Sequence, residues 1–173
     1  VPSQDTNAPS VRGIFNEIDV AAVTEVVSRA TAAKLLPLHA VLPYMIERES
    51  GSCMFVTSEG GRVPTAGQTT VALYAGGLVM TTKVIGKEMA RHKVRVNCIA
   101  VTLIGESPSW DGFEGKIEMT DLHRAQYARI QQRAPLGIAN PEDIGGVAAF
   151  LASEDSAFLT GSTLSPTGGL TFH

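Results

Sequence analysis

The sequence predicts an α/β fold in which helices flank a parallel sheet. Two short apolar runs, 53–57 and 94–100, have the length and continuity of strands that are covered on both faces. A longer segment with the apolar spacing of a helix precedes each run. Because parallel strands need a long crossover between them, this alternation of helix and strand favours a parallel sheet.

The chain is expected to form a single domain over residues 18–173, after an irregular segment over residues 1–17. Its 173 residues suffice for one domain with a sizeable core. Asp19 is a candidate N-cap for a long helix that continues to about Glu49. The later elements are predicted, in chain order, as a loop at 59–68, a helix at 69–92, a loop at 105–115, helices at 118–132 and 141–152, and a short strand at 162–165.

The charge and composition argue against two classes of partner. The formal net charge is −3, and the basic residues form no cluster, whereas a nucleic-acid-binding protein usually carries a basic stripe. No apolar run has the length of a membrane span, and the polar first residues do not resemble a signal peptide. We therefore expect a cytoplasmic protein without a nucleic-acid or membrane partner.

The cysteines and histidines do not indicate a metal or redox site. Cys53 and Cys98 lie inside apolar runs and lack the close spacing of a metal-binding or redox pair, so we expect buried structural thiols. No two histidines have metal-ligand spacing, and His123 is expected on the exposed face of a helix. We expect no bound metal.

Three segments carry a resemblance to a known family. They are LPYMIERESGSCMFVTS at 42–58, GKEMARHKVRVNCIAV at 86–101 and RAPLGIANPEDIGGVAAFLASEDSAFLTGSTLSPTGG at 133–169. They resemble, in that order, three parts of the short-chain dehydrogenase/reductase family: the helix and strand that end in the catalytic serine, the end of the active-site helix with the next strand, and the C-terminal segment. The resemblance implies a Rossmann-like parallel sheet that lacks the N-terminal nucleotide-binding half.

The resemblance also places the family's four catalytic positions on this sequence. The serine that orients the substrate falls on Ser58, the acid/base tyrosine on Val71 and the lysine on Ala75, while the relay asparagine falls near Ala30 or Thr31. Valine has no group that titrates, so it cannot move the proton that accompanies hydride transfer. Alanine has no positive charge that would shift a neighbouring pKa. Of the four positions, Ser58 alone retains the family's residue.

The phosphate-binding loop of a dinucleotide site is also missing from the sequence. Gly60-Gly61 and Gly76-Gly77 have neither the spacing nor the strand–turn–helix context of a GxGxxG motif. Without this loop the pyrophosphate of the cofactor loses its main anchoring contacts. We expect no cofactor on this chain alone; NAD or NADP would bind only if a missing N-terminal half or a partner supplied the site.

Other side chains remain as candidates for a site without redox chemistry. Tyr74 lies almost one helical turn after the expected tyrosine position and therefore faces a similar direction. The resemblance implies that the loop after the second predicted strand covers the substrate, and loops at such places carry specificity. The candidates are Ser58, Tyr74 and Glu106 as catalytic residues, with Trp110, Asp111 and Phe113 in a substrate loop.

The sequence leaves three functional hypotheses open. The preferred one is a non-catalytic or scaffolding subunit that pairs with itself or with a related short-chain dehydrogenase/reductase through the helices at about 20–48 and 69–92. The second is a scaffold that catalyses a non-redox reaction, of lyase, isomerase or cyclase type, on a small organic substrate. The third is a part of a longer NAD(P)-dependent oxidoreductase chain.

Overall fold

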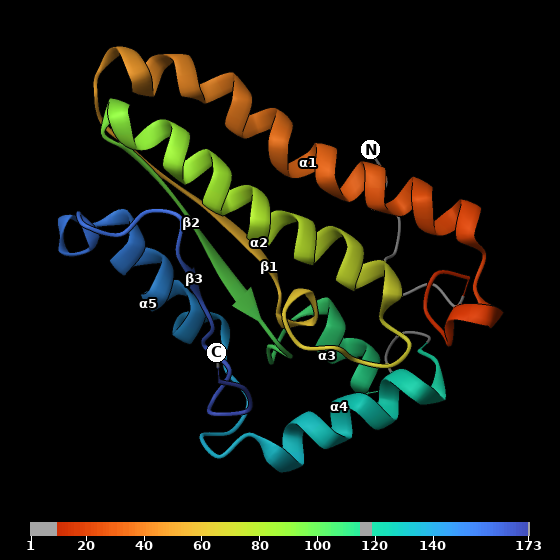
Figure 1. Ribbon diagram of the computed structural model, residues 1–173. Coiled ribbons are helices and arrows are strands. Elements are labelled where there is room, and N and C mark those ends of the chain that lie inside the picture. Colours follow the sequence, from red (N-terminus) through yellow and green to blue (C-terminus); the bar gives the residue numbers. More distant parts are fainter. Residues whose placement is uncertain (1–9, 115–118, 173) are drawn as a thin grey trace.

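A three-stranded parallel sheet forms the centre of the computed structural model, which describes residues 10–114 and 119–172 (Figure 1). The strands are β1 (Gly51–Ser58), β2 (Val94–Val101) and β3 (Thr163–Leu164), in the spatial order β1-β2-β3. β1 and β2 pair over their whole length, from Gly51 opposite Val94 to Ser58 opposite Val101. The predicted α/β class with a parallel sheet is confirmed.

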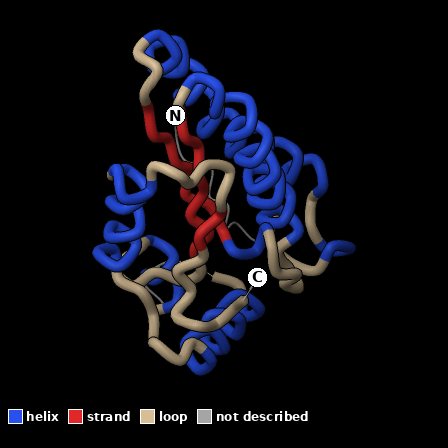
Figure 2. The backbone as a smooth tube through the Cα atoms, turned by 60° about the vertical axis from the view of Figure 1, so that its left-hand side comes forward, coloured by secondary structure: helices blue, strands red, loops and turns tan. Residues whose placement is uncertain are grey.

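Helices cover the two faces of the sheet and the ends of its strands (Figures 1 and 2). α1 (Val20–Glu47) and α2 (Thr69–Met89) lie side by side on one face, and α5 (Pro141–Ala152) lies on the other. α3 (Pro108–Phe113) and α4 (Asp121–Arg133) lie beyond the carboxyl end of β2. Short 3-10 turns complete the chain at Phe15–Glu17, Glu59–Gly61, Ala90–His92 and Glu154–Ser156.

Two apolar layers follow from the alternation of side chains along the strands. The layer under α1 and α2 joins side chains of both helices and both long strands, namely Leu38, Phe55, Leu78, Val96 and Cys98. The layer under α5 joins Ile99 of β2 with Ile144 and Leu151. β2 is therefore buried on both faces, as its apolar run predicts.

Capping residues set the ends of the helices at the predicted places. The Asp19 carboxylate accepts hydrogen bonds from the backbone N–H groups of Ala21 and Ala22, so this N-cap is confirmed. At α5, Asn140 and Asp143 form a reciprocal capping box, with a proline at the first helical position.

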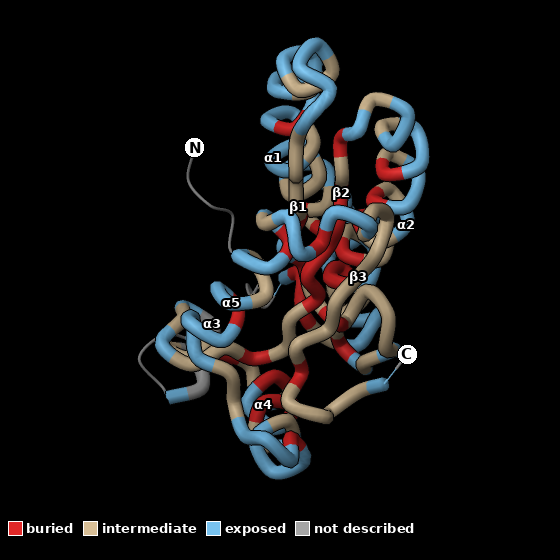
Figure 3. The backbone as a smooth tube through the Cα atoms, turned by 90° about the vertical axis from the view of Figure 1, so that its left-hand side faces the viewer, coloured by how far each residue is buried: buried red, intermediate tan, exposed pale blue. Residues whose placement is uncertain are grey.

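The structure corrects the prediction that both apolar runs are covered on both faces. β1 pairs only with β2 among the described residues, which makes it an edge strand. Val56 on this strand is 41% exposed, whereas β2 lies between two neighbours and is buried (Figure 3). The apolar run correctly indicated a strand, but one segment reveals neither its pairing partners nor which helices cover its faces.

The predicted loop at 105–115 and the predicted exposure of His123 are also wrong. The loop contains the single-turn helix α3, in which Ser107 Oγ accepts a hydrogen bond from the backbone N–H of Trp110 (3.2 Å) and Pro108 occupies the first helical position. His123 is fully buried, and its Nδ1 lies 2.9 Å from the Thr120 hydroxyl oxygen. It is buried because α4 turns this face inward.

The irregular N-terminal segment packs on the domain where it is described. Val11 is buried together with Val23 and Val26 of α1. The Thr70 hydroxyl donates a 2.5 Å hydrogen bond to the backbone carbonyl of Val11, and this contact ties the segment to the start of α2.

Both cysteines are free thiols. Cys98 is fully buried, and this burial raises the pKa of its thiol to about 11, so the thiol stays protonated at neutral pH. Cys53 is half-buried, and burial raises its pKa as well. Within 10–114 and 119–172, no helix is long and apolar enough to cross a membrane, and no three His, Cys, Asp or Glu side chains gather as a metal site.

Close backbone packing between α2 and the segment before β3 gives the first testable prediction. A methyl group at Gly86 would lie 2.7 Å from the backbone nitrogen of Gly161, which itself donates a 2.8 Å hydrogen bond to Val96. Gly86→Ala is expected to lower the free energy of unfolding by about 1 to 3 kcal/mol, because backbone must move to admit the methyl. Urea unfolding followed by circular dichroism measures the change.

Gly145→Ala in α5 is the matched control for this helix glycine. A methyl at Gly145 has no neighbour within 4 Å. The substitution is expected to raise the free energy of unfolding by about 0.5 to 1 kcal/mol, since alanine is the better helix former. Equal effects of the two substitutions would contradict the packing described for Gly86.

Candidate functional site

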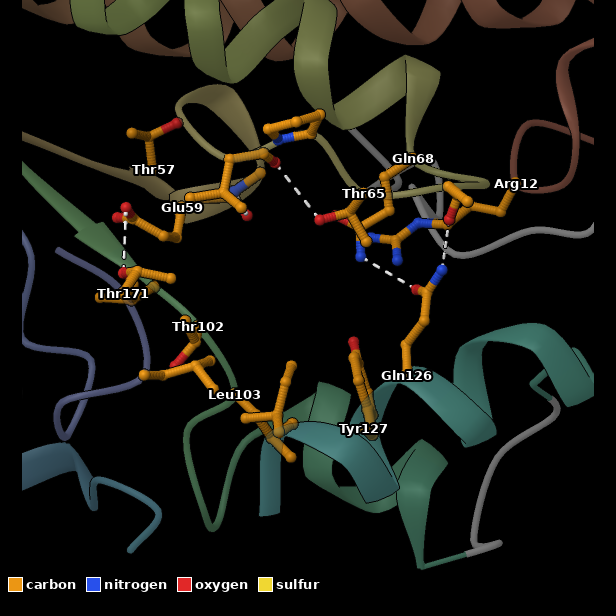
Figure 4. Close-up of a pocket in the computed structure, with 18 of the residues that line it drawn as sticks. Arg12, Thr57, Glu59, Thr65, Gln68, Thr102, Leu103, Gln126, Tyr127 and Thr171 are labelled. Atoms are coloured by element: carbon orange, nitrogen blue, oxygen red, sulfur yellow. Dashed lines mark hydrogen bonds between the residues drawn. The ribbon is translucent and has the colours of Figure 1, made fainter. Parts of the chain in front are cut away.

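A cavity of about 780 Å³ lies at the carboxyl ends of β1 and β2 (Figure 4). Its walls come from the turn after β1, the end of β2, both long helices, α4, the N-terminal segment and the C-terminal segment. Ligand sites of open α/β sheets lie at this end of the strands, because the loops that follow the strands converge there. The cavity is therefore the candidate functional site.

Two of the residues predicted for catalysis line this cavity. The Ser58 side chain accepts a 3.1 Å hydrogen bond from the backbone N–H of Gly60 and so caps the turn that follows β1. Burial raises the pKa of the Tyr74 hydroxyl; the positive charge of Arg12 opposes this shift, and Tyr127 adds to it. The structure thus brings Ser58 and Tyr74 to one cavity and keeps Tyr74 neutral at physiological pH.

Among the described residues, Glu106, Trp110 and Asp111 do not line the cavity. Glu106 is exposed in the turn before α3, where its backbone has a left-handed φ of 56°. Trp110 packs against Leu103, Met119 and Tyr127, and Asp111 lies half-buried in α3. Phe113 is the last residue of α3, and its side chain lies outside the described part of the structure.

A backbone contact explains why this segment points away from Ser58. Gly105 donates a 2.9 Å hydrogen bond to the carbonyl of Ala139, and Ile104 forms an isolated parallel bridge with the same residue. The chain after β2 is therefore held toward the start of α5 before it enters α3. The structure therefore does not bring Ser58 and Glu106, two of the three catalytic candidates, to one cavity.

The positions expected for the acid/base tyrosine and its lysine are packed beneath the turn Glu59–Gly61. Val71 is 1% exposed and Ala75 is fully buried. A methyl on Gly61 would lie 2.5 Å from the backbone of Ala75, and one on Gly60 would lie 3.0 Å from Val71 Cγ1. The turn thus lies directly on α2 through residues without side chains, and little space remains there for longer side chains.

A buried carboxylate in the cavity wall was not predicted from the sequence. Glu59 is 3% exposed, and its two oxygens accept hydrogen bonds from the hydroxyls of Ser165 (2.8 Å) and Thr171 (3.3 Å; Figure 4). Arg62 in turn donates a 2.6 Å hydrogen bond to Ser165. Glu59 therefore ties the turn after β1 to the chain that follows β3.

The opposite wall is formed by α4 and the N-terminal segment. The Gln126 amide nitrogen donates a hydrogen bond to the carbonyl of Ala66, and its oxygen accepts one from Gln68 (3.1 Å; Figure 4). The Tyr127 hydroxyl and the Arg12 guanidinium point into the cavity. The buried positions of α4 have helical spacing that sequence reasoning missed, whereas Arg12 carries no local signal of its role.

Comparisons with known proteins connect this architecture with one family. A family model described as enoyl-(acyl carrier protein) reductase matches residues 6–171. The 3-oxoacyl-(acyl-carrier-protein) reductase FabG of Chlamydia pneumoniae is 36% identical over 133 residues, which make up 76% of this chain and 50% of that protein. The (3R)-3-hydroxyacyl-CoA dehydrogenase of Homo sapiens is 33% identical over 121 residues, 69% of this chain and 42% of that protein. The chain thus spans about half the length of the curated relatives it matches.

A solved structure shows the same fold. The crystal structure of YwfH, an NADPH-dependent reductase involved in bacilysin biosynthesis, is similar with a TM-score of 0.79 at 22% sequence identity. The similarity covers 97% of this chain and 66% of that one. Since the family match extends over nearly the whole sequence and the fold agrees, this chain belongs to the short-chain dehydrogenase/reductase family.

Proposed function

We propose that this chain does not itself perform nicotinamide hydride transfer and serves as a non-catalytic subunit that pairs with a second short-chain dehydrogenase/reductase chain. The observation that supports the lack of hydride transfer is the packing of Val71 and Ala75 under the turn Glu59–Gly61. The family's reaction needs a titrating hydroxyl and a cation at these two positions, and valine and alanine supply neither. Ala30, near the relay position, adds only a methyl group to the cavity wall.

The residues of this chain also do not fit a nicotinamide dinucleotide. The sequence has no glycine-rich GxGxxG loop, and such a loop at a helix N-terminus normally holds the pyrophosphate. The relatives are named as reductases and dehydrogenases, and each is about twice as long as the segment matched here. Titration with NADH and with NADPH, followed by cofactor fluorescence, is expected to show no saturable binding; saturable binding would overturn this half of the proposal.

Placing the family's tyrosine and lysine at positions 71 and 75 is not expected to restore hydride transfer. The double variant Val71→Tyr with Ala75→Lys is expected to lose about 1 to 3 kcal/mol of unfolding free energy, because both side chains enter space filled by the turn. We expect no gain of NADPH binding or oxidation. Unfolding curves and NADPH fluorescence are the measurements.

Ala72→Lys is the matched control for this double variant. Ala72 is exposed on the same helix, so a lysine there is expected to change the free energy of unfolding by less than about 0.5 kcal/mol. A double variant that is as stable as the wild type and binds NADPH would show that the turn does not block the site.

The proposed pairing rests on exposed apolar residues of α1 and α2. Figure 3 colours much of both helices as exposed. On α2, Leu73, Met80 and Val84 are about half exposed and follow helical spacing, so they form one stripe. On α1, Leu36 and Tyr44 are both 69% exposed. Large apolar side chains exposed on neighbouring helices are typical of a protein interface.

The outer edge of β1 also favours association with another chain. Within 10–114 and 119–172, β1 offers its outer edge to no other strand, and an eight-residue edge with apolar side chains invites pairing. A further strand from a partner, or from a longer form of this chain, would satisfy these backbone groups. The two free thiols suit a reducing compartment, and we propose the cytoplasm as the location.

A charged residue in the apolar stripe of α2 is expected to dissociate the assembly. Native mass spectrometry at micromolar concentration is expected to show particles heavier than the 18.3 kDa chain, and Met80→Glu is expected to shift them to the monomer. Leu136→Glu is the control, because Leu136 is 86% exposed and lies outside both helices. A monomeric wild type would contradict self-association, and a variant that assembles as the wild type does would contradict the proposed interface.

A second candidate function is a non-redox reaction in the cavity, and the shared position of Ser58 and Tyr74 favours it. Both hydroxyls line one space at the strand ends, where substrates of α/β enzymes bind. Tyr74→Phe removes the hydroxyl and keeps the ring in place. Turnover of a small organic substrate that this variant abolishes, with unchanged folding, would favour the second candidate over the first.

A further inference from the structure

The charged side chains around the cavity are mostly cations. Among the described residues that line it, Glu59 is the single carboxylate, and its oxygens accept the hydrogen bonds of Ser165 and Thr171. The cations come from three elements, the N-terminal segment, α1 and α4, and they are Arg12, Lys34, Arg129 and Arg133. The wall thus carries an excess of positive charge in a chain whose net charge is −3.

Arg12 is the cation that is built into the wall. It is 8% exposed, and its guanidinium points into the cavity (Figure 4). The hydrogen bond from Thr70 to the carbonyl of Val11 fixes the backbone beside it. Its positive charge acts on the neighbouring Tyr74, whose pKa it lowers against the larger effect of burial.

The other cations lie on α1 and α4, two helices on opposite sides of the cavity. Arg129 and Arg133 lie one turn apart on α4, and Lys34 projects from α1. Within 10–114 and 119–172, no ion pair joins Lys34, Arg129 or Arg133 to a carboxylate. Arginine pairs are well suited to hold a carboxylate, since a guanidinium can donate two parallel hydrogen bonds to it.

The remaining wall suits the apolar body of an organic molecule. Apolar side chains from several segments line the cavity, among them Val63, Leu103, Ile130 and Leu170. The volume of about 780 Å³ lies within the range of small-molecule sites and far exceeds an inorganic ion. The Tyr74 and Tyr127 hydroxyls add polar groups that can orient a ligand.

We propose that this cavity binds a small organic carboxylate, whose anionic group is attracted by Arg12, Lys34, Arg129 and Arg133 and whose apolar body fills the space between α2 and α4. The proposal does not depend on the redox inactivity or on the pairing proposed above. A non-catalytic subunit with such a site would be a ligand-binding subunit, and a repurposed enzyme would use it to hold its substrate.

Calorimetry with a charged ligand and its neutral counterpart tests the proposal. The probes are 4-phenylbutyrate and 4-phenylbutyramide, which share an apolar body and differ in charge. The carboxylate is expected to bind about tenfold more tightly than the amide, because it alone forms charge-assisted hydrogen bonds with the arginines. Added salt is expected to weaken carboxylate binding and to leave amide binding unchanged.

The double variant Arg129→Gln with Arg133→Gln assigns the binding to this cavity. It is expected to weaken 4-phenylbutyrate binding by about tenfold and to leave the amide unaffected, since only the charges are removed. Both arginines are exposed, so the fold is expected to persist, and an unfolding curve verifies it. Lys87→Gln is the control, because Lys87 is an exposed cation near the far end of α2 and does not line the cavity.

Four results with the wild type and the arginine variant would overturn the proposal, and a fifth concerns the control. They are no binding of 4-phenylbutyrate at millimolar concentration, equal binding of the amide, carboxylate binding that the arginine variant leaves unchanged, and competition by inorganic phosphate at equal concentration. The last result would mean that the cations attract any small anion and that the apolar wall adds nothing. Loss of binding in the Lys87 control would likewise point to a general charge effect.

Discussion

The close backbone contact between the turn Glu59–Gly61 and α2 is the constraint on which the rest of the site depends. Any side chain at Gly61 would collide with the backbone of Ala75 and Gly76, so the contact exists only because both sides lack bulk. This contact sets the direction in which the chain leaves β1. It places the Ser58 hydroxyl over Gly60, where it caps the turn, and directs the buried Glu59 carboxylate toward Ser165 and Thr171.

The same contact affects the two roles of this family's active-site helix, a structural role and a chemical role, in different ways. The inner side of α2 supports the sheet through Leu78 and the turn through Ala75, and this structural role needs small or apolar residues. The chemical role would need long polar side chains that reach past the turn from the positions of Val71 and Ala75. Both demands fall on the same helix face, so a turn packed this tightly is compatible with the structural role and opposes the chemical one.

The fold was predictable from the sequence where a residue's environment is set by its own segment. The continuous run of β2, the Asp19 cap and the spacing of α1 and α2 are local signals, and each was confirmed. The edge position of β1 and the burial of His123 were not, because they depend on which elements meet across the fold. Trp110 illustrates the same limit: it lies in the expected loop region but packs into a cluster instead of lining the site.

For the cavity, the family pattern identified Ser58 and helical spacing identified Tyr74, but most of the charged wall lies outside any motif. Arg12 lines the cavity although it belongs to a segment that the sequence presents as irregular, and the hydrogen bond between Thr70 and Val11 holds the backbone beside it. Glu59 follows the strand directly, yet the hydroxyls that donate to it belong to Ser165 and Thr171, which are distant in the sequence. The charge of the cavity is therefore a property of tertiary structure, assembled from segments far apart in the chain. A family resemblance that rests on aligned motifs can show which catalytic groups have been replaced, but it contains no information about groups that the fold has added.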